Sequence, residues 1–569
     1  MRKSVSTSSA RSEERIASLE TALAASHDVI AKLTRERDLL VASHLRLRQE
    51  LELLKRRIFV AKAERVDTAQ LEMEFAQTLA ELDRLGGTPV PADSGSEDDK
   101  PTNGSKTKPT GRRDLRKAAI EEVRVELSDP LFEDLVARGD AERIGFEESC
   151  KLAWQRGGVR RLLIARVKYR AVDSRGESVI ETTPIPPECF PRSLAAPSML
   201  AHIINEKHCD GIPHNRTEDR LGRDGVPIDR GTLCRWTEDA GATAGATVVA
   251  AMRTDAMRTA FCIATDATGV AVQPIRTADK RRQACNRGHY FVLIADRDHI
   301  LFEYTPKETS AFVNEMFRGY SGYVQADAKS VYDSLFRDLD PANPDDDPSR
   351  VVPKEIGCFA HCRRKYWEAT VAKDAVAREG LARIGRIFEL DASWRGRPPV
   401  EIARLRHAHL RPHLDAFFIW AEQQYELVRD QRGLLRSALG YSVRQKHALT
   451  RVLADGRLIL ENNRSERELR RIAVGRKAWM FVGSDDHAES AGHLLSLIAS
   501  ARLHRLDPEG YLRDLFRVLA HWPRDRYLEL APKYWARTRA RLDPAQLALE
   551  IGDLTVPPPL PAEEQPTAR

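Results

Sequence analysis

The sequence lacks the features of a membrane or secreted protein. No apolar run approaches the roughly 20 residues that a helix needs to cross a bilayer. Residues 1–15 are rich in serine and charge, without the apolar segment of a secretory signal. The 8 cysteines are scattered over 569 residues, which is typical of reduced thiols rather than of a disulfide framework. We therefore expect a cytoplasmic protein that contacts no membrane.

The chain also lacks a strong charge of either sign. Its 90 Lys and Arg residues nearly balance its 84 Asp and Glu residues, so the net charge is only +6. The net charge therefore does not indicate whether the protein binds nucleic acid, and only local clusters of basic residues can do so. The length exceeds what one hydrophobic core usually serves, so we expect several structural units.

Glycine and proline are absent from residues 12–85, which predicts a long helix. Apolar residues recur there at heptad spacing, and this pattern favours a coiled coil that self-associates. The alternative is a helix folded back on its own domain. Residues 86–117 are rich in Gly, Pro, Ser and charge and are predicted to be a flexible linker. Its basic end suits phosphate contacts, although a solvated hinge explains it as well.

Two smaller regions are expected next. Residues 118–185 have a mixed pattern that predicts a small α/β segment, with a strand at 162–172. Residues 190–255 have a helical pattern. Its first helix is expected to contain SMLAHIINEKH and to continue through HNRTEDRLGRDG.

A second helix of this region should begin near Arg230, with Asp229 as its cap. A helix, a turn with glycine and a helix carrying Arg230, Thr232 and Arg235 form the arrangement of a DNA-binding helix-turn-helix. A helical hairpin without a DNA-binding role is the alternative, because many such hairpins have the same pattern.

Strand patterns dominate the start of the next region, 256–500. FCIATDATGVAV has Asp266 at its centre, and two further strands are expected at 289–295 and 299–305. A helix and the short strand GYVQAD then lead to Asp327. An acid on the first and on the last strand of this order predicts an α/β fold with a ribonuclease-H-like core. A helical insertion is expected at about 365–450.

The two aspartates suit phosphoryl transfer to DNA. Such reactions are commonly run by two divalent ions, and Mg²⁺ prefers carboxylates and water. A third acid on a helix that crosses the same edge would complete the site. The alternative is that Asp266 and Asp327 only cap the ends of their strands.

Residues 460–484, LENNRSERELRRIAVGRKAWMFVGS, combine acids with a dense set of cations. Glu466 and Arg470 are four residues apart and would share one face of a helix. An acid flanked by Arg and Asn suits a metal ligand that lies beside DNA phosphates. The alternative is an ordinary surface helix with several ion pairs. The cations expected to contact DNA are Arg467, Arg470, Arg471, Arg476 and Lys477.

Cys358, His361 and Cys362 have a spacing that could suggest zinc, but a fourth ligand is missing, so no zinc is expected. His361 with Arg363 and Arg364 could lie near the active site and its DNA phosphates. A histidine packed in the core is about equally consistent with the pattern.

Several of these stretches, in order along the chain, resemble the transposases of the IS66 insertion-sequence family. The resemblance begins with LLKRRIFVAKAER (53–65) and DGIPHNRTEDRLGRDGVPIDRGTLCRW (210–236). It continues with IATDATGVAV, GYVQADAKSVYD and GCFAHCRRKYWEA. It ends with ENNRSERELRRIAVGRKAWMFVGS and SLIASARLHRLDPEGYLRDL.

The resemblance implies a DDE-type transposase in which Asp266 and Asp327 are the first two acids. The third is expected to be Glu466, the position that the family keeps as glutamate, with Glu461 as the alternative third acid. The three acids would bind two Mg²⁺ (or Mn²⁺) ions. Two departures matter: the glutamate that usually follows the first acid is Ala267, and no CxxC pair is present where the family has a zinc-binding segment.

The expected function is metal-dependent cleavage and strand transfer of insertion-sequence ends by in-line phosphoryl transfer. The partners would be DNA (the terminal inverted repeats and the target), further copies of the chain, and accessory proteins of the same element. The alternatives are a catalytically impaired, transposase-derived DNA-binding protein and a nuclease of the same fold. Residues 501–555 are expected to form a C-terminal helical domain, and 556–569 a disordered tail.

Overall fold

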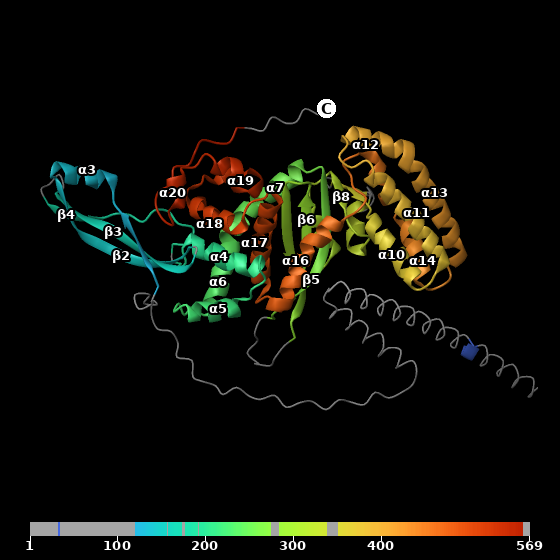
Figure 1. The fold of residues 1–569 in the computed structure, drawn as a ribbon, viewed down its shortest axis with the longest axis horizontal. Coiled ribbons are helices and arrows are strands. Elements are labelled where there is room, and N and C mark those ends of the chain that lie inside the picture. Colours follow the sequence, from blue (N-terminus) through green and yellow to red (C-terminus); the bar gives the residue numbers. More distant parts are fainter. Residues whose placement is uncertain are drawn as a thin grey trace, which may run out of the picture. The chain divides into compact units, whose positions relative to one another are not determined.

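The computed structural model describes residues 32–34, 120–155, 157–172, 177–191, 193–274, 284–337 and 351–561 (Figure 1). Apart from 32–34, which are helical, the predicted coiled coil and linker lie outside the described residues. The described chain forms two compact units. One is Phe359–Leu460, and the other holds the residues described up to Cys358 and from Glu461 onward.

The larger unit begins with a four-stranded sheet centred on one long strand. Its elements are β1 (Glu122–Leu127), α3 (Pro130–Arg138), β2 (Ala141–Gln155), β3 (Gly158–Val172) and β4 (Ser178–Thr182). Strand β3 pairs antiparallel with β2 and β4 and parallel with β1. The strand predicted at 162–172 is confirmed and begins four residues earlier.

A helical region follows, with elements α4 (Pro197–His208), α5 (His214–Arg223), α6 (Arg230–Ala240), the π-helical turn η2 (Gly241–Gly245) and α7 (Ala246–Thr259). The continuous first helix predicted here is wrong, because α4 and α5 are separate. Gly211 has a left-handed φ of 71°, and Pro213 precedes α5 in an extended conformation, so the helix cannot continue. Helix α6 starts at Arg230 as predicted, with the Asp229 side chain accepting from the Thr232 amide.

A five-stranded mixed sheet lies at the centre of this unit, in the order β7-β6-β5-β8-β9. The strands are β5 (Cys262–Val272), β6 (Asn286–Ala295), β7 (His299–Thr305), β8 (Tyr323–Gln325) and β9 (Lys354–Ile356). Strand β6 is antiparallel to both β5 and β7, and β8 is parallel to β5 and β9. It follows that β5, β7, β8 and β9 all run in one direction.

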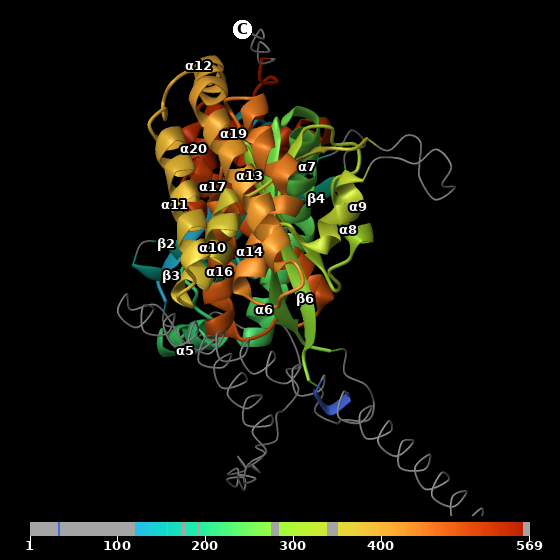
Figure 2. The ribbon, with the colours of Figure 1, turned by 90° about the vertical axis from the view of Figure 1, so that its right-hand side faces the viewer.

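Helices cover both faces of this sheet. On one face Val292 and Ile294 pack with Leu469 and Ile472 of α16 (Asn463–Trp479). The alternate residues of β6, Phe291 and Leu293, point to the opposite face and share a core with α8 (Ser310–Met316) and α9 (Asp333–Phe336). In Figure 2 the sheet separates α8 and α9 from α16.

Helix α17 (Asp485–Leu503) protects the free edge of β7. The Ser496 hydroxyl accepts from the Phe302 amide at 2.8 Å, and the Ser500 hydroxyl accepts from the Ile300 amide at 2.9 Å. A Cβ on Gly492 would come within 2.9 Å of the Phe302 carbonyl oxygen. Gly492, Ser496 and Ser500 recur at every fourth position, so the helix can approach β7 closely and accept hydrogen bonds from its backbone amides. Without the helix, this edge strand would be open to pairing with another chain.

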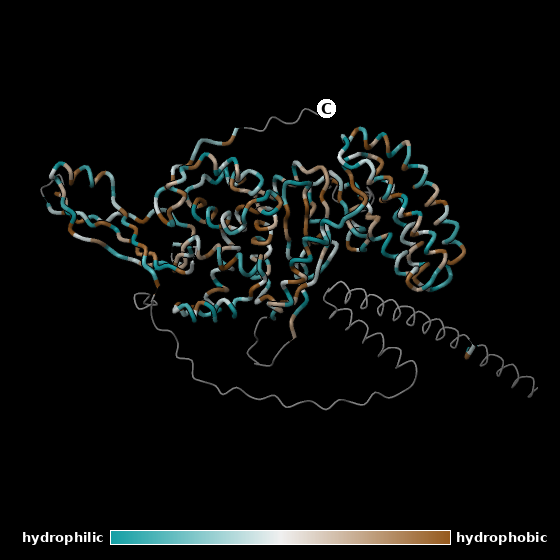
Figure 3. Tube along the Cα trace, viewed as in Figure 1, coloured by the Kyte–Doolittle hydropathy of each residue, from teal (hydrophilic) through white to brown (hydrophobic). Residues whose placement is uncertain are grey.

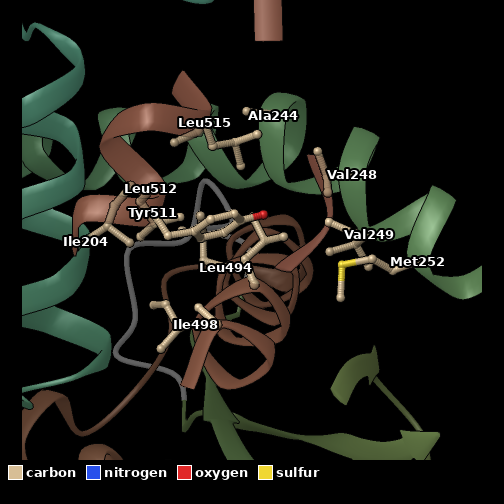
Figure 4. Close-up of a cluster of buried hydrophobic side chains, with 14 of the residues drawn as sticks. Ile204, Ala244, Val248, Val249, Met252, Leu494, Ile498, Tyr511, Leu512 and Leu515 are labelled. Carbon is tan, nitrogen blue, oxygen red and sulfur yellow. The ribbon is translucent and has the colours of Figure 1, made fainter. Parts of the chain in front are cut away.

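The C-terminal part is helical, as predicted. It comprises α18 (Pro508–Val518), η6 (Leu519–His521), η7 (Arg524–Leu530), α19 (Pro532–Arg539) and α20 (Pro544–Ala548). Leu512 and Leu515 pack with Leu494, Ile498 and Val248 in the core drawn in Figure 4. Apolar residues also concentrate along the strands of the central sheet (Figure 3). No helix in the described ranges is long and apolar enough to span a bilayer.

The smaller unit is all helical and is inserted between β9 and α16. It comprises α10 (Phe359–Val371), α11 (Ala375–Ala392), α12 (Pro399–Leu405), η4 (Arg406–Leu410), α13 (Arg411–Val428), α14 (Leu434–Arg444), α15 (Lys446–Thr450) and η5 (Arg451–Ala454). The insertion predicted at about 365–450 is therefore present and somewhat longer. Its ends meet, because the Phe359 amide donates to the Leu460 carbonyl at 2.8 Å.

Candidate active site

The sheet register brings Asp266 and Asp327 to the same level. Strand β8 pairs with β5 so that Gln325 lies opposite Ala264. Each aspartate lies two residues beyond its member of that pair, and the two strands are parallel neighbours. Both side chains are mostly buried, with 15% of each exposed.

One ammonium group lies between the two aspartates. The Lys329 Nζ is 3.8 Å from Asp266 Oδ1 and 3.9 Å from Asp327 Oδ2. The Lys329 amide donates to the Asp327 carbonyl at 2.8 Å, which bends the chain directly after β8. The structure therefore brings the two predicted acids together around a single cation position.

Glu308 is a third acid at this position, and it was not predicted from the sequence. Its Oε1 lies 3.8 Å from the same Lys329 Nζ. It follows β7, whose carboxyl end points to the same edge of the sheet as those of β5 and β8. Its position shortly after a strand could have indicated a site residue. That inference requires knowing that β7 runs parallel to β5 in the sheet, which the sequence does not reveal.

The buried side chain of Tyr332 lies close enough to these three acids to feel their charge. Burial raises the pKa of its hydroxyl well above the ordinary value, and the charges of Asp327, Asp266 and Glu308 act in the same direction. Its Oη lies 3.5 Å from the Thr265 hydroxyl. The Tyr332 side chain therefore stays neutral and adds no charge to the site.

Helix α16, which carries Glu466, is fixed to β5 beside Asp266. The buried Asn462 side chain donates to the Thr265 carbonyl at 2.8 Å and accepts from the Ser465 hydroxyl at 2.7 Å. Glu466 lies in the first turn of the helix and is half-buried. Glu461 precedes the helix, and its carboxylate accepts from the Asn463 side-chain amide at 2.8 Å.

The cations of α16 divide into two groups. Arg476 donates to the Gly269 carbonyl and lies 3.4 Å from the Thr268 hydroxyl, so it helps to hold α16 on β5. Arg471 pairs with Glu468 at 3.1 Å. Arg467, Arg470 and Lys477 are exposed on the helix.

The other predicted DNA-contacting residues lie away from this helix in the chain. Arg230 and Arg235 of α6 are exposed, and the Arg235 guanidinium donates to the Thr232 hydroxyl at 3.0 Å. Arg363 and Arg364 are exposed on α10 in the smaller unit, where Arg364 pairs with Glu368 at 3.3 Å.

The donor set around Lys329 fits a hard divalent cation. Carboxylate oxygens are the ligands that Mg²⁺ and Mn²⁺ prefer, and here two strands aim such oxygens at one positive charge. Across the described ranges, no three His, Cys, Asp or Glu side chains stand close enough to hold a metal ion. The carboxylates would therefore have to close in around an ion.

The side chains of Cys358 and Cys362 contact other residues of the protein. The Cys358 Sγ accepts from the Asn462 amide at 3.2 Å, and the Cys362 Sγ lies 3.3 Å from the Ser442 hydroxyl. Both thiols are buried, and none of the 8 cysteines, all of which lie in the described ranges, forms a disulfide.

The sequence is similar to several known proteins over most of its length. It is 26% identical to the uncharacterized protein y4hP of Sinorhizobium fredii (strain NBRC 101917 / NGR234), over 67% of this chain and 70% of the relative. It is 24% identical to the uncharacterized protein y4jD of the same organism, over 83% of this chain and 90% of the relative.

The family comparison covers the central sheet, the insertion and the helices around them. Residues 192–490 match the profile described as "Transposase IS66 family". Residues 496–532 match the profile described as "IS66 C-terminal element". Together the two matches take in every stretch on which the resemblance rested except residues 53–65, and the chain belongs to the IS66 transposase family.

Proposed function

We propose that this chain is a DDE-type DNA transposase that cleaves and joins DNA ends at the site formed by Asp266 and Asp327. The observation that carries the proposal is the approach of these two carboxylates to one cation position, 3.8 and 3.9 Å from the Lys329 ammonium. Family membership supports the DNA substrate.

The order and directions of the five strands support a ribonuclease-H-like core. Three consecutive strands are antiparallel neighbours, and two further strands continue the sheet parallel to the first of them. In this arrangement an acid on the first strand and an acid after the fourth strand stand side by side. The third acid would come from α16, which Asn462 fixes beside the first strand.

Asp266, Asp327 and Glu466 would hold Mg²⁺ or Mn²⁺, which when bound activates the attacking oxygen and stabilises the leaving oxygen. The chain itself positions the DNA. Exposed Arg467, Arg470 and Lys477 would neutralise phosphates beside the acids. Arg230 and Arg235 on α6 would bind the element ends, since the capped start of a second helix is the part that enters a groove in helix-turn-helix proteins.

The proposal extends to assembly. Joining two element ends requires at least two subunits, and we propose that the predicted coiled coil at 12–85 brings them together. Accessory proteins of the same element are proposed as further partners on the strength of the family alone.

A strand-transfer assay tests the function. Purified full-length chain is incubated with labelled DNA carrying the ends of its element, a target plasmid and Mg²⁺ or Mn²⁺. The wild type should nick the ends and join them to the target, whereas Asp266→Asn and Asp327→Asn should lose at least about 100-fold in rate while binding the ends normally. An inactive wild type that still binds its ends would favour the catalytically impaired DNA-binding protein instead.

A further inference from the structure

Three carboxylates surround the Lys329 ammonium at nearly equal distance. Nζ lies 3.8 Å from Asp266 Oδ1, 3.8 Å from Glu308 Oε1 and 3.9 Å from Asp327 Oδ2. None of the three is as short as a charge-assisted hydrogen bond, which spans about 2.7–2.9 Å. The ammonium is therefore shared among the acids and is not committed to one partner.

Glu308 is held in place by the ends of two elements. The Thr305 hydroxyl, at the end of β7, donates to the Lys307 carbonyl at 2.9 Å and lies 3.3 Å from the Lys307 amide. The Thr309 hydroxyl caps α8 by accepting from the Phe312 amide at 3.3 Å. Glu308 sits between these two turns, so the position of its backbone is fixed.

The Glu308 carboxylate is directed toward the site. Its Oε1 atom is buried and has no hydrogen-bond partner among the described residues. Its Oε2 atom lies 3.5 Å from the His289 Nδ1. A buried carboxylate oxygen without a donor is costly, so its proximity to a shared cation position points to a ligand role.

We propose that Lys329 occupies the cation position of this site in the metal-free protein, and that Glu308 is an additional carboxylate of the same site. The inference rests on the proposed function, since it concerns the metal that Asp266 and Asp327 would hold. A divalent ion has to displace the ammonium. The Lys329 side chain is 42% exposed, so it has a path out to solvent.

The distances support this exchange. An ammonium holds the oxygens 3.8–3.9 Å away, whereas Mg²⁺ requires oxygens at about 2.0–2.1 Å. The carboxylate oxygens therefore stand too far apart to coordinate a divalent ion while the Lys329 ammonium lies between them. Three acids that converge without a cation would repel one another, and the ammonium compensates this charge until an ion replaces it.

The test measures Mn²⁺ binding to the full-length chain without DNA, from the electron paramagnetic resonance signal of free Mn²⁺. Lys329→Met should tighten Mn²⁺ binding about tenfold, because a cation next to the site is removed, and Glu308→Gln should weaken it about tenfold. The metal-free Lys329→Met variant should also melt at a lower temperature than wild type and gain more from Mn²⁺.

Matched controls remove the same charges elsewhere in the larger unit. Lys354→Met changes a lysine on β9 that stacks on Tyr323, and Glu315→Gln changes a glutamate of α8 that is 57% exposed. Both should leave Mn²⁺ affinity within about twofold of wild type. Lys329→Gln replaces Lys329→Met if the latter does not fold.

The outcomes separate this inference from the proposed function. In one outcome, Asp266→Asn lowers the Mn²⁺ affinity, but the Lys329 and Glu308 variants bind Mn²⁺ as their controls do. This outcome overturns the inference and leaves the proposed site intact. Mn²⁺ affinity that is unaffected by Asp266→Asn overturns the proposed site itself. Weaker binding in Lys329→Met would make the lysine a support of the site and would also overturn the inference.

Discussion

Glu461 and Glu466 stand on either side of the residue that fixes α16 to the central sheet. Asn462 is 1% exposed and bonded to the backbone of β5. Glu461 lies before this anchor and is engaged with the Asn463 side chain. Glu466 lies one helical turn after it, on a helix whose position relative to Asp266 is set by the anchor. Glu466 is the third acid that we propose, and Glu461 is the alternative.

This choice gives a prediction for two neighbouring substitutions. Glu466→Gln should lower strand transfer at least about 100-fold, because a carboxylate ligand is lost without a change in shape. Glu461→Gln should stay within a few-fold of wild type, because an amide can still accept from Asn463. The measurement is the rate of strand transfer at saturating DNA, with DNA binding as the control. The opposite order of the two variants would assign the third acid to Glu461.

At the level of single residues, Asp266 and Asp327 were predicted from the strand pattern together with the resemblance to the family; the apolar pattern alone would have left both as ordinary charged residues. Glu308 and Lys329 were not predicted. Glu308 lies between a strand and a helix, where charged residues are ordinary, and its proximity to the two aspartates depends on β7 running parallel to β5 two strands away. Such a relation is a property of the sheet and leaves no local signal.

At the scale of elements, a buried polar cluster joins α7, β7 and α19. The Asp255 carboxylate is 2% exposed and lies 3.0 Å from His299 Nε2 and 3.4 Å from Lys533 Nζ. Burial by itself would raise the pKa of Asp255, but the hydrogen bond from His299 and the charge of Lys533 outweigh it and lower the pKa to about 2. The ionised carboxylate therefore stabilises the packing of these three elements.

A pH dependence of stability follows. The folded-state pKa of Asp255 is about 2, below its ordinary value of 3.8, so its contribution is present above pH 4 and is lost as the pH falls toward 2. The shift corresponds to about 2 kcal/mol. Urea unfolding of wild type and Asp255→Asn should differ by about this amount at pH 6 and converge only as the pH falls to about 2 and below. A difference that does not change with pH would contradict the account.

The elements that the sequence predicted best are long or strongly patterned. The strands at 289–295 and 299–305 and the start of α6 at Arg230 are confirmed. The break between α4 and α5 was missed because the helical periodicity continues on both sides of Gly211 and Pro213. Strand β9 has only three residues, too few for a period to be recognised.

At the scale of the whole molecule, the chain leaves the larger unit after Cys358 and returns at Glu461. Within that unit, the Asn462 amide donates to the Cys358 thiol at 3.2 Å, so the two points are adjacent. The insertion thus separates β9 from α16 by about a hundred residues of sequence without separating them in space. This is why the third acid could be predicted only from a motif, and not from its distance along the chain.

We propose that Asp266 and Asp327 hold the metal ion at which DNA strands are cleaved and joined. The most direct test is the metal dependence of strand transfer in Asp266→Cys, with Ala267→Cys as the neighbouring control. A thiolate is a poor ligand for Mg²⁺ and a better one for Mn²⁺, which lies in the transition series. If Asp266 binds the ion, Asp266→Cys should show no strand transfer in Mg²⁺ and measurable strand transfer in Mn²⁺. Strand transfer in Mg²⁺ at the wild-type rate would contradict it.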